Sequence, residues 1–345
     1  MKIPKSPSEI TAEWLNSVLF SKTSNSEIAS IEIDKDFGPW SLLGKAARVK
    51  INYVTSGCEP KSVIVKFQVS VSEPKREGEI YSLLFEEKVS YIPRIYGKFG
   101  NGNLVMEDMT STHSVLKNDL TISQIQNVVV ILADLQTRFF DDSRVPKYDL
   151  SHFVNAIRIN MQSWDIFKKR YQDQLGSEAA DFEWILKNPE VVSSHYNSNP
   201  SSLSHGDVNK ANLLFPNDGS NAPIFIDWQL SAQRVIPFDL SYFIVKQLTV
   251  EQRRKYEKDL LKEYYEMLGD KIKASYSFNH LVLDYRACVT RSMLSAVMRV
   301  GPRFENQPNR FKKADELATR VIEAVRDLKP IEAIQELKER GFLES

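Results

Sequence analysis

Residues 204–215 read SHGDVNKANLLF, and residues 224–231 read IFIDWQLS. Asp207 and Asn212 are five positions apart, and Asp227 ends a run of β-branched and aromatic residues. Carboxylate and amide oxygens are the ligands that a hard cation such as Mg²⁺ prefers. The two stretches therefore indicate a site where a metal ion is held.

The spacing of Asp207 and Asn212 matches the D-x-x-x-x-N spacing of a kinase catalytic loop. Phosphoryl transfer demands positioning and charge neutralisation rather than covalent chemistry by the protein. On this interpretation Asp207 orients an acceptor hydroxyl and takes its proton, and Asn212 and Asp227 bind Mg²⁺. Alone, an HGD turn or a strand-ending aspartate would signify little. Their order and spacing together favour a catalytic site. His205 is expected to stiffen the loop.

A lysine within an apolar strand supplies an upstream partner. Lys66 lies in VIVKF, residues 63–67, and Glu77 follows eleven positions later in a predicted helix. Lysine is seldom buried without a partner, although a strand-edge lysine commonly extends to solvent. A Lys66–Glu77 pair would hold the α- and β-phosphates of a nucleotide. Glu79 competes for this role, and the register relative to Tyr81 favours Glu77.

These motifs together resemble the aminoglycoside-phosphotransferase and choline-kinase branch of the protein-kinase-like fold. Within that branch the chain is most similar to the ecdysteroid-kinase-like (CHK) group of small-molecule kinases, particularly in Asp-Trp-Gln at 227–229. The resemblance spans about residues 28–300. The matching segments are VIVKF (63–67), REGEIY (76–81), LVMEDM (104–109), SHGDVNKANLLF (204–215), IFIDWQLS (224–231) and PFDLSYFI (237–244).

The resemblance implies a role for each matching position. It implies that Glu107 to Met109 form the hinge whose backbone binds adenine, with Met106 beside the base. It also implies that Asp239 braces the catalytic loop, although a helix N-cap explains this aspartate equally well. The roles of the other matching residues are those given above: Asp207 as catalytic base, Asn212 and Asp227 as magnesium ligands, Lys66 as phosphate lysine and Glu77 as its partner.

Two departures from the protein-kinase pattern limit the inference. The expected phosphate loop, Gly38 to Gly44, is not a G-x-G-x-x-G loop, so the amides that cover the triphosphate are not assigned. The arginine of H-R-D and an A-P-E segment are absent. Their absence disfavours a kinase that acts on peptides.

The resemblance and the residue patterns predict an α+β, two-lobed protein-kinase-like fold. We expect a small antiparallel-sheet lobe over residues 1–109 and a larger, mostly helical lobe over residues 110–345. Capping-box patterns predict helix starts at Ser6 and Thr121. Strands are expected at 28–37, 47–54, 62–69, 94–99, 103–109, 212–215 and 224–228, and further helices at 73–88, 151–172, 178–187, 250–268, 279–299, 309–327 and 330–340.

Composition narrows the function classes. The 345 residues are 42% hydrophobic and carry 45 basic and 45 acidic side chains. This zero net charge argues against a nucleic-acid or anionic-membrane partner. No apolar run reaches the roughly 18 residues of a membrane span. Two cysteines form neither a disulfide framework nor a zinc motif, so we expect a cytoplasmic protein.

The acceptor is less defined by the sequence than the nucleotide site, and no sequence pattern indicates an oligomeric state. Trp164, Tyr285, Arg286 and Arg291 are candidates to line an acceptor pocket, although core packing or a surface ion pair is the default explanation for each. These segments hold no acidic cluster of the kind that a polycationic aminoglycoside needs. The expected acceptor is an unspecified small-molecule alcohol.

The leading hypothesis is an ATP- and Mg²⁺-dependent phosphotransferase that moves the γ-phosphate to that hydroxyl. The alternative is a catalytically inactive nucleotide-binding regulatory module, a pseudokinase, although intact catalytic residues disfavour it. A metal-dependent hydrolase using Asp207, Asp227 and His205 would leave Lys66 and Glu77 unexplained.

Overall fold

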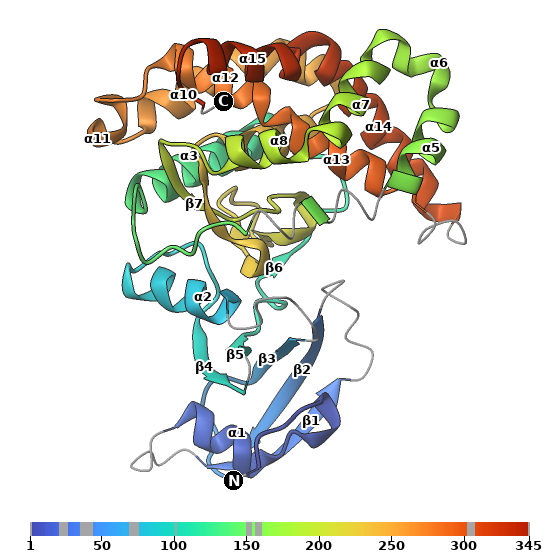
Figure 1. The fold of residues 1–345 in the computed structure, drawn as a ribbon. Helices are drawn as coiled ribbons and strands as arrows, with labels where there is room; N and C mark the ends of the chain where they lie inside the picture. Colours follow the sequence, from blue (N-terminus) through green and yellow to red (C-terminus); the bar gives the residue numbers. More distant parts are fainter. Residues whose placement is uncertain are drawn as a thin grey trace. The chain divides into compact units, whose positions relative to one another are not determined.

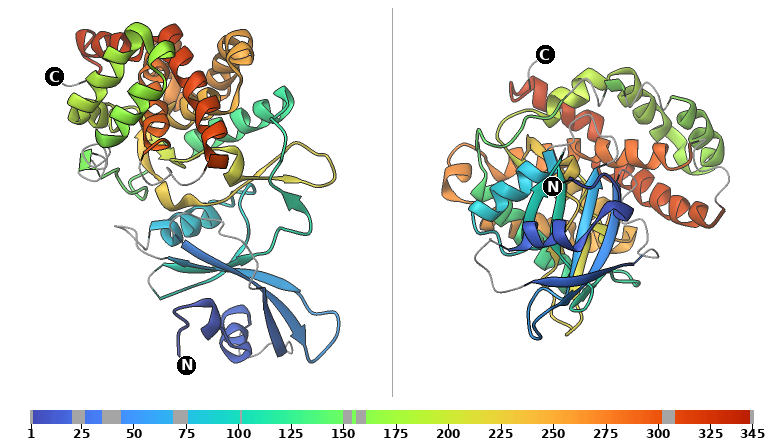
Figure 2. Two further views of the ribbon diagram at one scale, coloured as in Figure 1. Left: turned by 90° about the vertical axis from the view of Figure 1, so that its right-hand side faces the viewer. Right: turned by 90° about the horizontal axis from the view of Figure 1, so that it is seen from below.

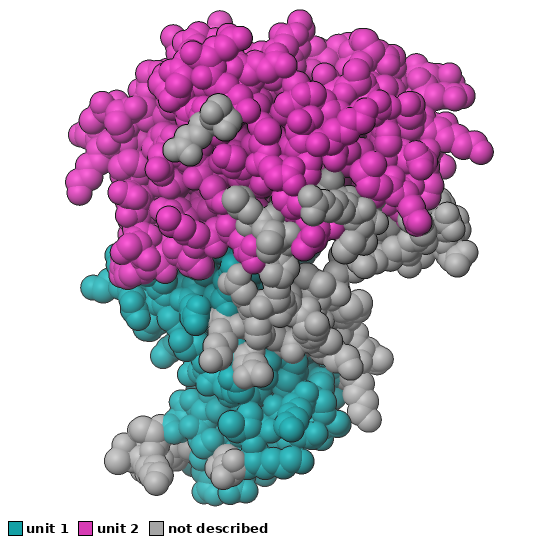
Figure 3. Space-filling model, in the orientation of Figure 1, with its two compact units in different colours: residues 1–116, 211–231 teal, residues 117–210, 232–345 magenta. Residues whose placement is uncertain are grey.

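The structure is a computed structural model that describes residues 2–20, 27–34, 44–68, 76–100, 102–149, 154–155, 161–301 and 308–343. The expected phosphate loop lies outside the described residues, apart from Gly44. The chain divides into two compact units, shown in Figure 3: unit 1 comprises residues 1–116 and 211–231, and unit 2 comprises residues 117–210 and 232–345.

Unit 1 contains a five-stranded antiparallel sheet with strand order β1-β2-β3-β5-β4 (Figure 1). The strands that the residue patterns predict in this part of the chain are present with nearly the same bounds. They are β1 (Ile28–Asp34), β2 (Gly44–Tyr53), β3 (Ser62–Gln68), β4 (Ile95–Phe99) and β5 (Asn103–Glu107).

The two faces of β3 differ in what they contact. Val63, Val65 and Phe67 are buried in a core with Trp14 and Leu15 of helix α1 (Ala12–Leu19). Because successive strand residues point to opposite faces, position 66 belongs to the other face. Helix α2 (Arg76–Glu86) lies on that face, and the left view of Figure 2 shows α1 and α2 on opposite sides of the sheet. The lysine is therefore directed away from the apolar core.

The first helix does not begin where its capping box predicts. Residues Pro7–Glu9 form a single 3₁₀ turn, and the Ser6 side chain caps nothing. Helix α1 begins at Ala12, where the Thr11 hydroxyl accepts a hydrogen bond from the Trp14 N–H at 3.1 Å. Thr11 is thus the functional N-cap, and the Ser6 prediction is wrong.

The rest of unit 1 is a small sheet with strand order β6-β8-β9, formed by His113–Ser114, Leu213–Pro216 and Ile224–Phe225. Strand β9 is shorter than predicted. Asp227 has φ 68° and ψ 60°, a left-handed conformation that no strand accommodates, and the 3₁₀ turn Trp228–Leu230 follows. The predicted strand to residue 228 therefore ends before the aspartate.

Unit 2 is mainly helical, with two paired strands, β7 (Ser201–Ser204) and β10 (Ala232–Val235). The predicted capping box at Thr121 is confirmed, and Thr249 forms another. The predicted helix over 279–299 is two helices joined at Cys288. The described helices are α3 (Ile122–Arg138), α5 (Met161–Arg170), α6 (Gln172–Leu175), α7 (Ala179–Lys187), α8 (Pro189–Tyr196), α9 (Phe238–Gln247), α10 (Val250–Met267), α11 (Asp270–Lys273), α12 (Phe278–Ala287), α13 (Val289–Met298), α14 (Pro308–Leu328) and α15 (Pro330–Glu339).

The main core of unit 2 gathers buried side chains from α5, α7, α8, α9, α13 and α14. Within the residues that the structure describes, none of the helices combines the length and apolar character needed to cross a membrane.

Candidate active site

Lys66 forms two ion pairs at one end of a pocket in unit 1. Its Nζ lies 2.8 Å from Oε1 of Glu77 and 2.5 Å from Oδ1 of Asp227. Burial lowers the pKa of Lys66, but the two carboxylates outweigh it and raise the pKa above its ordinary value. Lys66 is therefore a fixed cation, and its helix partner is Glu77 rather than Glu79.

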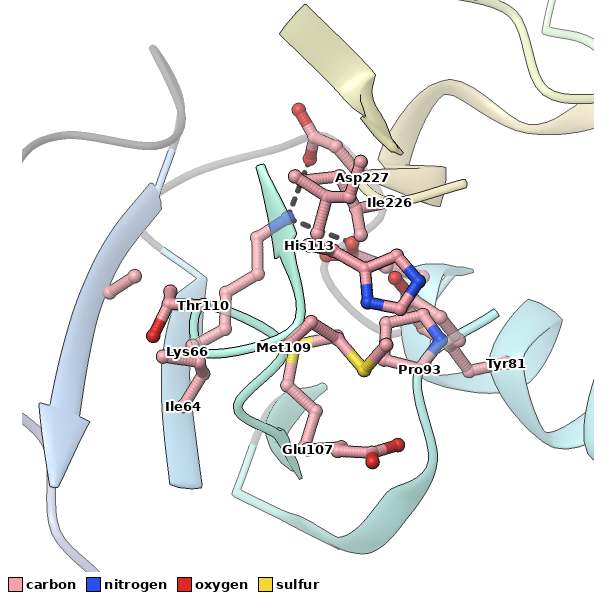
Figure 4. Close-up of a pocket in the computed structure, with 14 residues that line it drawn as sticks. Ile64, Lys66, Tyr81, Pro93, Glu107, Met109, Thr110, His113, Ile226 and Asp227 are labelled. Atoms are coloured by element: carbon pink, nitrogen blue, oxygen red, sulfur yellow. Dashed lines mark hydrogen bonds and ion pairs between the residues drawn. The ribbon is translucent and has the colours of Figure 1, made fainter. Parts of the chain in front are cut away.

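All the residues that line the pocket belong to unit 1. Figure 4 shows Lys66 and Asp227 at one end and Glu107 and Met109 at the other. The walls between them are largely apolar, with the lining residues Ala46, Ile64, Met106, Leu214 and Ile226. An apolar slot that leads to a charged end suits a planar base attached to a polyphosphate.

The predicted hinge follows strand β5 at the other end of the pocket. Its central residue, Asp108, points its carboxylate at Arg48, Ser62 and Thr110, at distances of 2.6–3.0 Å. Although burial raises the pKa of Asp108, these donors lower it below its ordinary value. The Met109 N–H donates to no described residue. The hinge is thus fixed by a side-chain network while one backbone donor beside the pocket stays available.

Asn212 and Asp227 emerge together from the β8–β9 hairpin. Strand pairing places Leu213 opposite Phe225, and the Asn212 carbonyl accepts from the Ile226 N–H at 3.1 Å. In the described part of the chain, no three His, Cys, Asp or Glu side chains gather as a metal site. Carboxylate and amide oxygens are the ligand types that Mg²⁺ prefers, so Asp227 and Asn212 are the candidates to hold this ion together with phosphate and water. One ammonium facing two carboxylates also leaves a negative charge that a cation would offset.

In unit 2, Asp239 fixes the backbone of the catalytic loop. Its carboxylate accepts from the His205 N–H at 2.6 Å and from the Gly206 N–H at 2.9 Å. Asp239 is buried in the first turn of α9, whose N-cap is Pro237. The geometry therefore matches a brace for the loop, and Asp239 is not the N-cap. Nδ1 of the buried His205 accepts from the Asp207 N–H at 3.3 Å, as expected for a stiffening residue.

Two cations, Lys246 and Arg291, and one hydroxyl act on the Asp207 carboxylate within unit 2. The Tyr242 hydroxyl donates to Asp207 Oδ1 at 3.1 Å, and the Lys246 Nζ lies 3.8 Å from the same oxygen. Burial raises the pKa of Asp207, but Lys246 and then Arg291 outweigh it, so the pKa lies below its ordinary value. Asp207 is therefore ionised at neutral pH and able to accept a hydrogen bond from a hydroxyl.

Sequence reasoning missed Tyr242 and Lys246. A signal was present, since Asp239, Tyr242 and Lys246 recur at helical spacing and therefore share one face of α9. The larger share of the apolar pocket walls was also missed, because Ala46, Ile64 and other apolar lining residues look like ordinary core positions in the sequence.

The candidate acceptor residues separate into two groups. Trp164 is buried and stacks on Phe182 with ring centroids 5.6 Å apart, so it is a core residue. Tyr285 is buried and donates to Glu257 at 2.7 Å, and Arg286 donates to the Leu328 carbonyl at 2.7 Å. For these three residues, packing and contacts within unit 2 explain the side chain without a ligand. Arg291 alone lies near Asp207.

The family of the chain follows from a match over most of its length. The model of a family described as "Uncharacterized oxidoreductase dhs-27" (DUF1679) matches residues 101–337. The chain belongs to this family. The DUF1679 family is ecdysteroid-kinase-like, so the predicted resemblance is confirmed. No curated protein matches the chain.

Solved structures share the fold at low sequence identity. A spectinomycin phosphotransferase in complex with ADP and spectinomycin is 14% identical, with 93% of this chain and 99% of that chain covered and a TM-score of 0.56. An ethanolamine kinase from Plasmodium vivax is 14% identical, with coverage of 87% and 84% and a TM-score of 0.52. A microcompartment-associated aminopropanol kinase is 13% identical, with coverage of 92% and 98% and a TM-score of 0.51. The predicted protein-kinase-like fold class is thereby confirmed.

Proposed function

We propose that this DUF1679 protein is an ATP- and Mg²⁺-dependent phosphotransferase that moves the γ-phosphate to a hydroxyl of a small-molecule alcohol. The observation that carries the proposal is the double ion pair of Lys66 with Glu77 and Asp227, at the charged end of an apolar pocket. The phosphotransferases and kinases among the solved structures support the same reaction class.

Each residue has a distinct part in the proposed reaction. Met109 and Glu107 bind the adenine through the hinge backbone, with Met106 beside the ring. Lys66, held by Glu77, binds the α- and β-phosphates. Asn212 and Asp227 hold Mg²⁺, which offsets the charge of the phosphates when it is bound.

Asp207 orients the acceptor and receives its proton. The acceptor oxygen forms a bond to the γ-phosphorus, the bond from that phosphorus to the β,γ-bridging oxygen breaks, and ADP leaves. The lowered pKa of Asp207 suits this role, because in a loose transition state the hydroxyl proton departs late and needs only a weak base.

The test begins with the full-length protein, ATP and Mg²⁺. Calorimetric titration measures ATP affinity with and without Mg²⁺, and ADP release in the absence of an alcohol measures slow transfer to water. We expect Mg²⁺-dependent ATP binding that Asp227→Asn weakens. We also expect Asp207→Asn to lower ADP release by a factor of about 10²–10⁴ while ATP affinity is retained.

A matched control is Asp270→Asn, which changes an exposed aspartate of unit 2 and should leave both measurements unchanged. Binding of ATP without any ADP release, from water or from a panel of alcohols, would identify a pseudokinase instead. Phosphate release from a phosphoester without nucleotide would identify the hydrolase. Either result refutes the proposed reaction.

A further inference from the structure

Helices α9 and α13 place a positively charged group of side chains beside Asp207. The Lys246 Nζ lies 2.7 Å from the Tyr242 hydroxyl, which itself donates to Asp207. The Arg291 guanidinium lies over the Tyr242 ring, with its carbon 4.6 Å from the ring centroid. Tyr242 therefore fixes the positions of Lys246 and Arg291 relative to Asp207. We call Lys246 and Arg291 the cation pair.

The cation pair exceeds the charge of the carboxylate that it faces. Lys246 is 3.8 Å from Asp207, beyond a direct hydrogen bond, and its side chain is only 10% exposed. Arg291 is partly buried, and its guanidinium makes no hydrogen bond or ion pair with any side chain of the described residues. Arg291 and Lys246 share the single carboxylate of Asp207, so one of the two positive charges is left without an anion among the described residues. Withdrawing that charge from water costs free energy, which an anionic ligand would offset.

We propose that the acceptor alcohol carries an anionic group, a carboxylate, phosphate or sulfate, which Arg291 and Lys246 bind while its hydroxyl faces Asp207. This inference rests on the proposed function, because it names the substrate class of that reaction. The planar guanidinium of Arg291 supplies paired donors that match two oxygens of an anion. Lys246 supplies a compact point charge to the same group.

The same arrangement disfavours a cationic acceptor. An ammonium group beside Asp207 would meet two positive charges at close range, and this repulsion discriminates against such substrates. The ethanolamine and aminopropanol kinases that share the fold are named for amine acceptors. The cation pair therefore predicts that this protein differs from them in the charge of its substrate.

The test compares alcohols that differ only in charge. One set is 3-hydroxypropionate, 3-hydroxypropionamide and 3-aminopropanol, and a larger set is 4-(hydroxymethyl)benzoate, its amide and 4-(aminomethyl)benzyl alcohol. Thermal shift of the full-length protein is measured with each alcohol in saturating ADP and Mg²⁺, so that the nucleotide-phosphate site is already filled. We expect a carboxylate alcohol to stabilise the wild type while its amide and amine counterparts do not.

Variants assign the effect to the cation pair. Arg291→Met and Lys246→Met should each weaken carboxylate binding at least about tenfold, a loss of 1.4 kcal/mol. Arg291→Lys should restore part of it. Arg299→Met, which changes an exposed arginine at the end of α13, is the matched control and should bind as the wild type does.

Any of three outcomes with the alcohol panel overturns the inference. They are the absence of carboxylate-specific stabilisation in the wild type, its persistence in Arg291→Met, and preferential ADP release with the amide or amine alcohols. A loss of ATP affinity in Arg291→Met and Lys246→Met with unchanged carboxylate binding would show that the cation pair serves the nucleotide, which also overturns it. Carboxylate binding without ADP release would instead refute the phosphotransferase and leave the anion site standing.

Discussion

Lys66 and Asp227 are 161 positions apart in the sequence, yet Nζ of the lysine lies 2.5 Å from Oδ1 of the aspartate. Their side chains are 9% and 12% exposed, so the pair is largely withdrawn from water. The contact joins the five-stranded sheet to the segment that follows the β8–β9 hairpin. The lysine thus has a structural role that is independent of any ligand.

Replacing this lysine should destabilise the protein as well as weaken nucleotide binding. In Lys66→Met, Glu77 and Asp227 lose their shared cation and stay buried, which typically costs about 3–5 kcal/mol. Lys50→Met is the matched control, because that lysine lies on β2 with an exposed side chain and its surface ion pair contributes less than about 1 kcal/mol. Urea unfolding measures the free energy of unfolding of both variants. Equal stabilities for the two variants would contradict the structural role.

The brace of the catalytic loop makes a different prediction. Asparagine in place of Asp239 keeps one acceptor oxygen, so one of the two N–H groups, of His205 or Gly206, loses its partner. A buried unsatisfied donor costs about 1–3 kcal/mol, and the loop that carries Asp207 should lose its fixed geometry. ADP release by Asp239→Asn should therefore fall, by about tenfold for each 1.4 kcal/mol that the displaced loop adds to the activation barrier.

Nucleotide affinity separates this effect from general unfolding. Asp239 belongs to unit 2, whereas the pocket with Lys66 belongs to unit 1. ATP affinity of Asp239→Asn, measured by calorimetry below its melting temperature, should match the wild type. A parallel fall in affinity and turnover would mean that the substitution acts on the whole fold rather than on the loop.

The parts of the fold that the sequence predicts well are those where a local pattern determines the structure. The β-branched run over 62–69 predicts β3, and the two capping-box residues at Thr121 and Gln124 predict the start of α3. The ion pair of Lys66 with Glu77 was also accessible, since strand and helix positions restrict which glutamate can face the lysine.

The features that escaped prediction depend on the tertiary context. The capping pattern at Ser6 is present in the sequence, but the Ser6 side chain caps no helix. The helix that packs Trp14 and Leu15 on the sheet begins at Ala12, with Thr11 as its N-cap. The left-handed Asp227 ends β9 early, although its sequence neighbours favour a strand. Helical spacing relates Lys246 to Asp239, but no spacing rule brings Arg291 of another helix to the same carboxylate.

A close approach between α1 and β4 gives a stability prediction. A Cβ added at Gly97 would lie 2.5 Å from Cγ1 of Val18, a separation that real side chains do not tolerate. Gly97→Ala should therefore destabilise the protein by about 1–3 kcal/mol, as overpacking does. Val18→Ala removes the obstructing methyl group, so the double variant should recover most of this loss.

A double-mutant cycle in urea measures the coupling. We expect an interaction free energy of about 1 kcal/mol or more between the two positions, because the residues are in direct contact. Additive effects would mean that the strand shifts to accommodate the alanine, and the close approach would then carry no energetic weight.

His280 in α12 gives a pH dependence of stability. Its buried ring stacks on Phe342, with centroids 3.9 Å apart, and its Nε2 lies 3.4 Å from Oδ2 of Asp284. Burial lowers the pKa of His280 below its ordinary 6.5, and the neighbouring His195 and Arg340 act in the same direction against the opposing Asp284. The folded protein therefore takes up this proton less readily than the unfolded chain.

The sign of the effect follows from proton linkage. Above pH 6.5 the histidine is neutral in both states and contributes no pH dependence. As the pH falls below 6.5 the unfolded chain binds the proton first, so the free energy of unfolding decreases until the pH passes the lowered pKa of the folded state. His280→Phe removes this group while keeping a ring against Phe342. We expect the variant to lose less stability than the wild type between pH 7 and pH 5, measured by urea unfolding at each pH. A steeper loss in the variant would mean that the histidine is protonated more readily in the folded protein, with Asp284 rather than burial controlling its pKa.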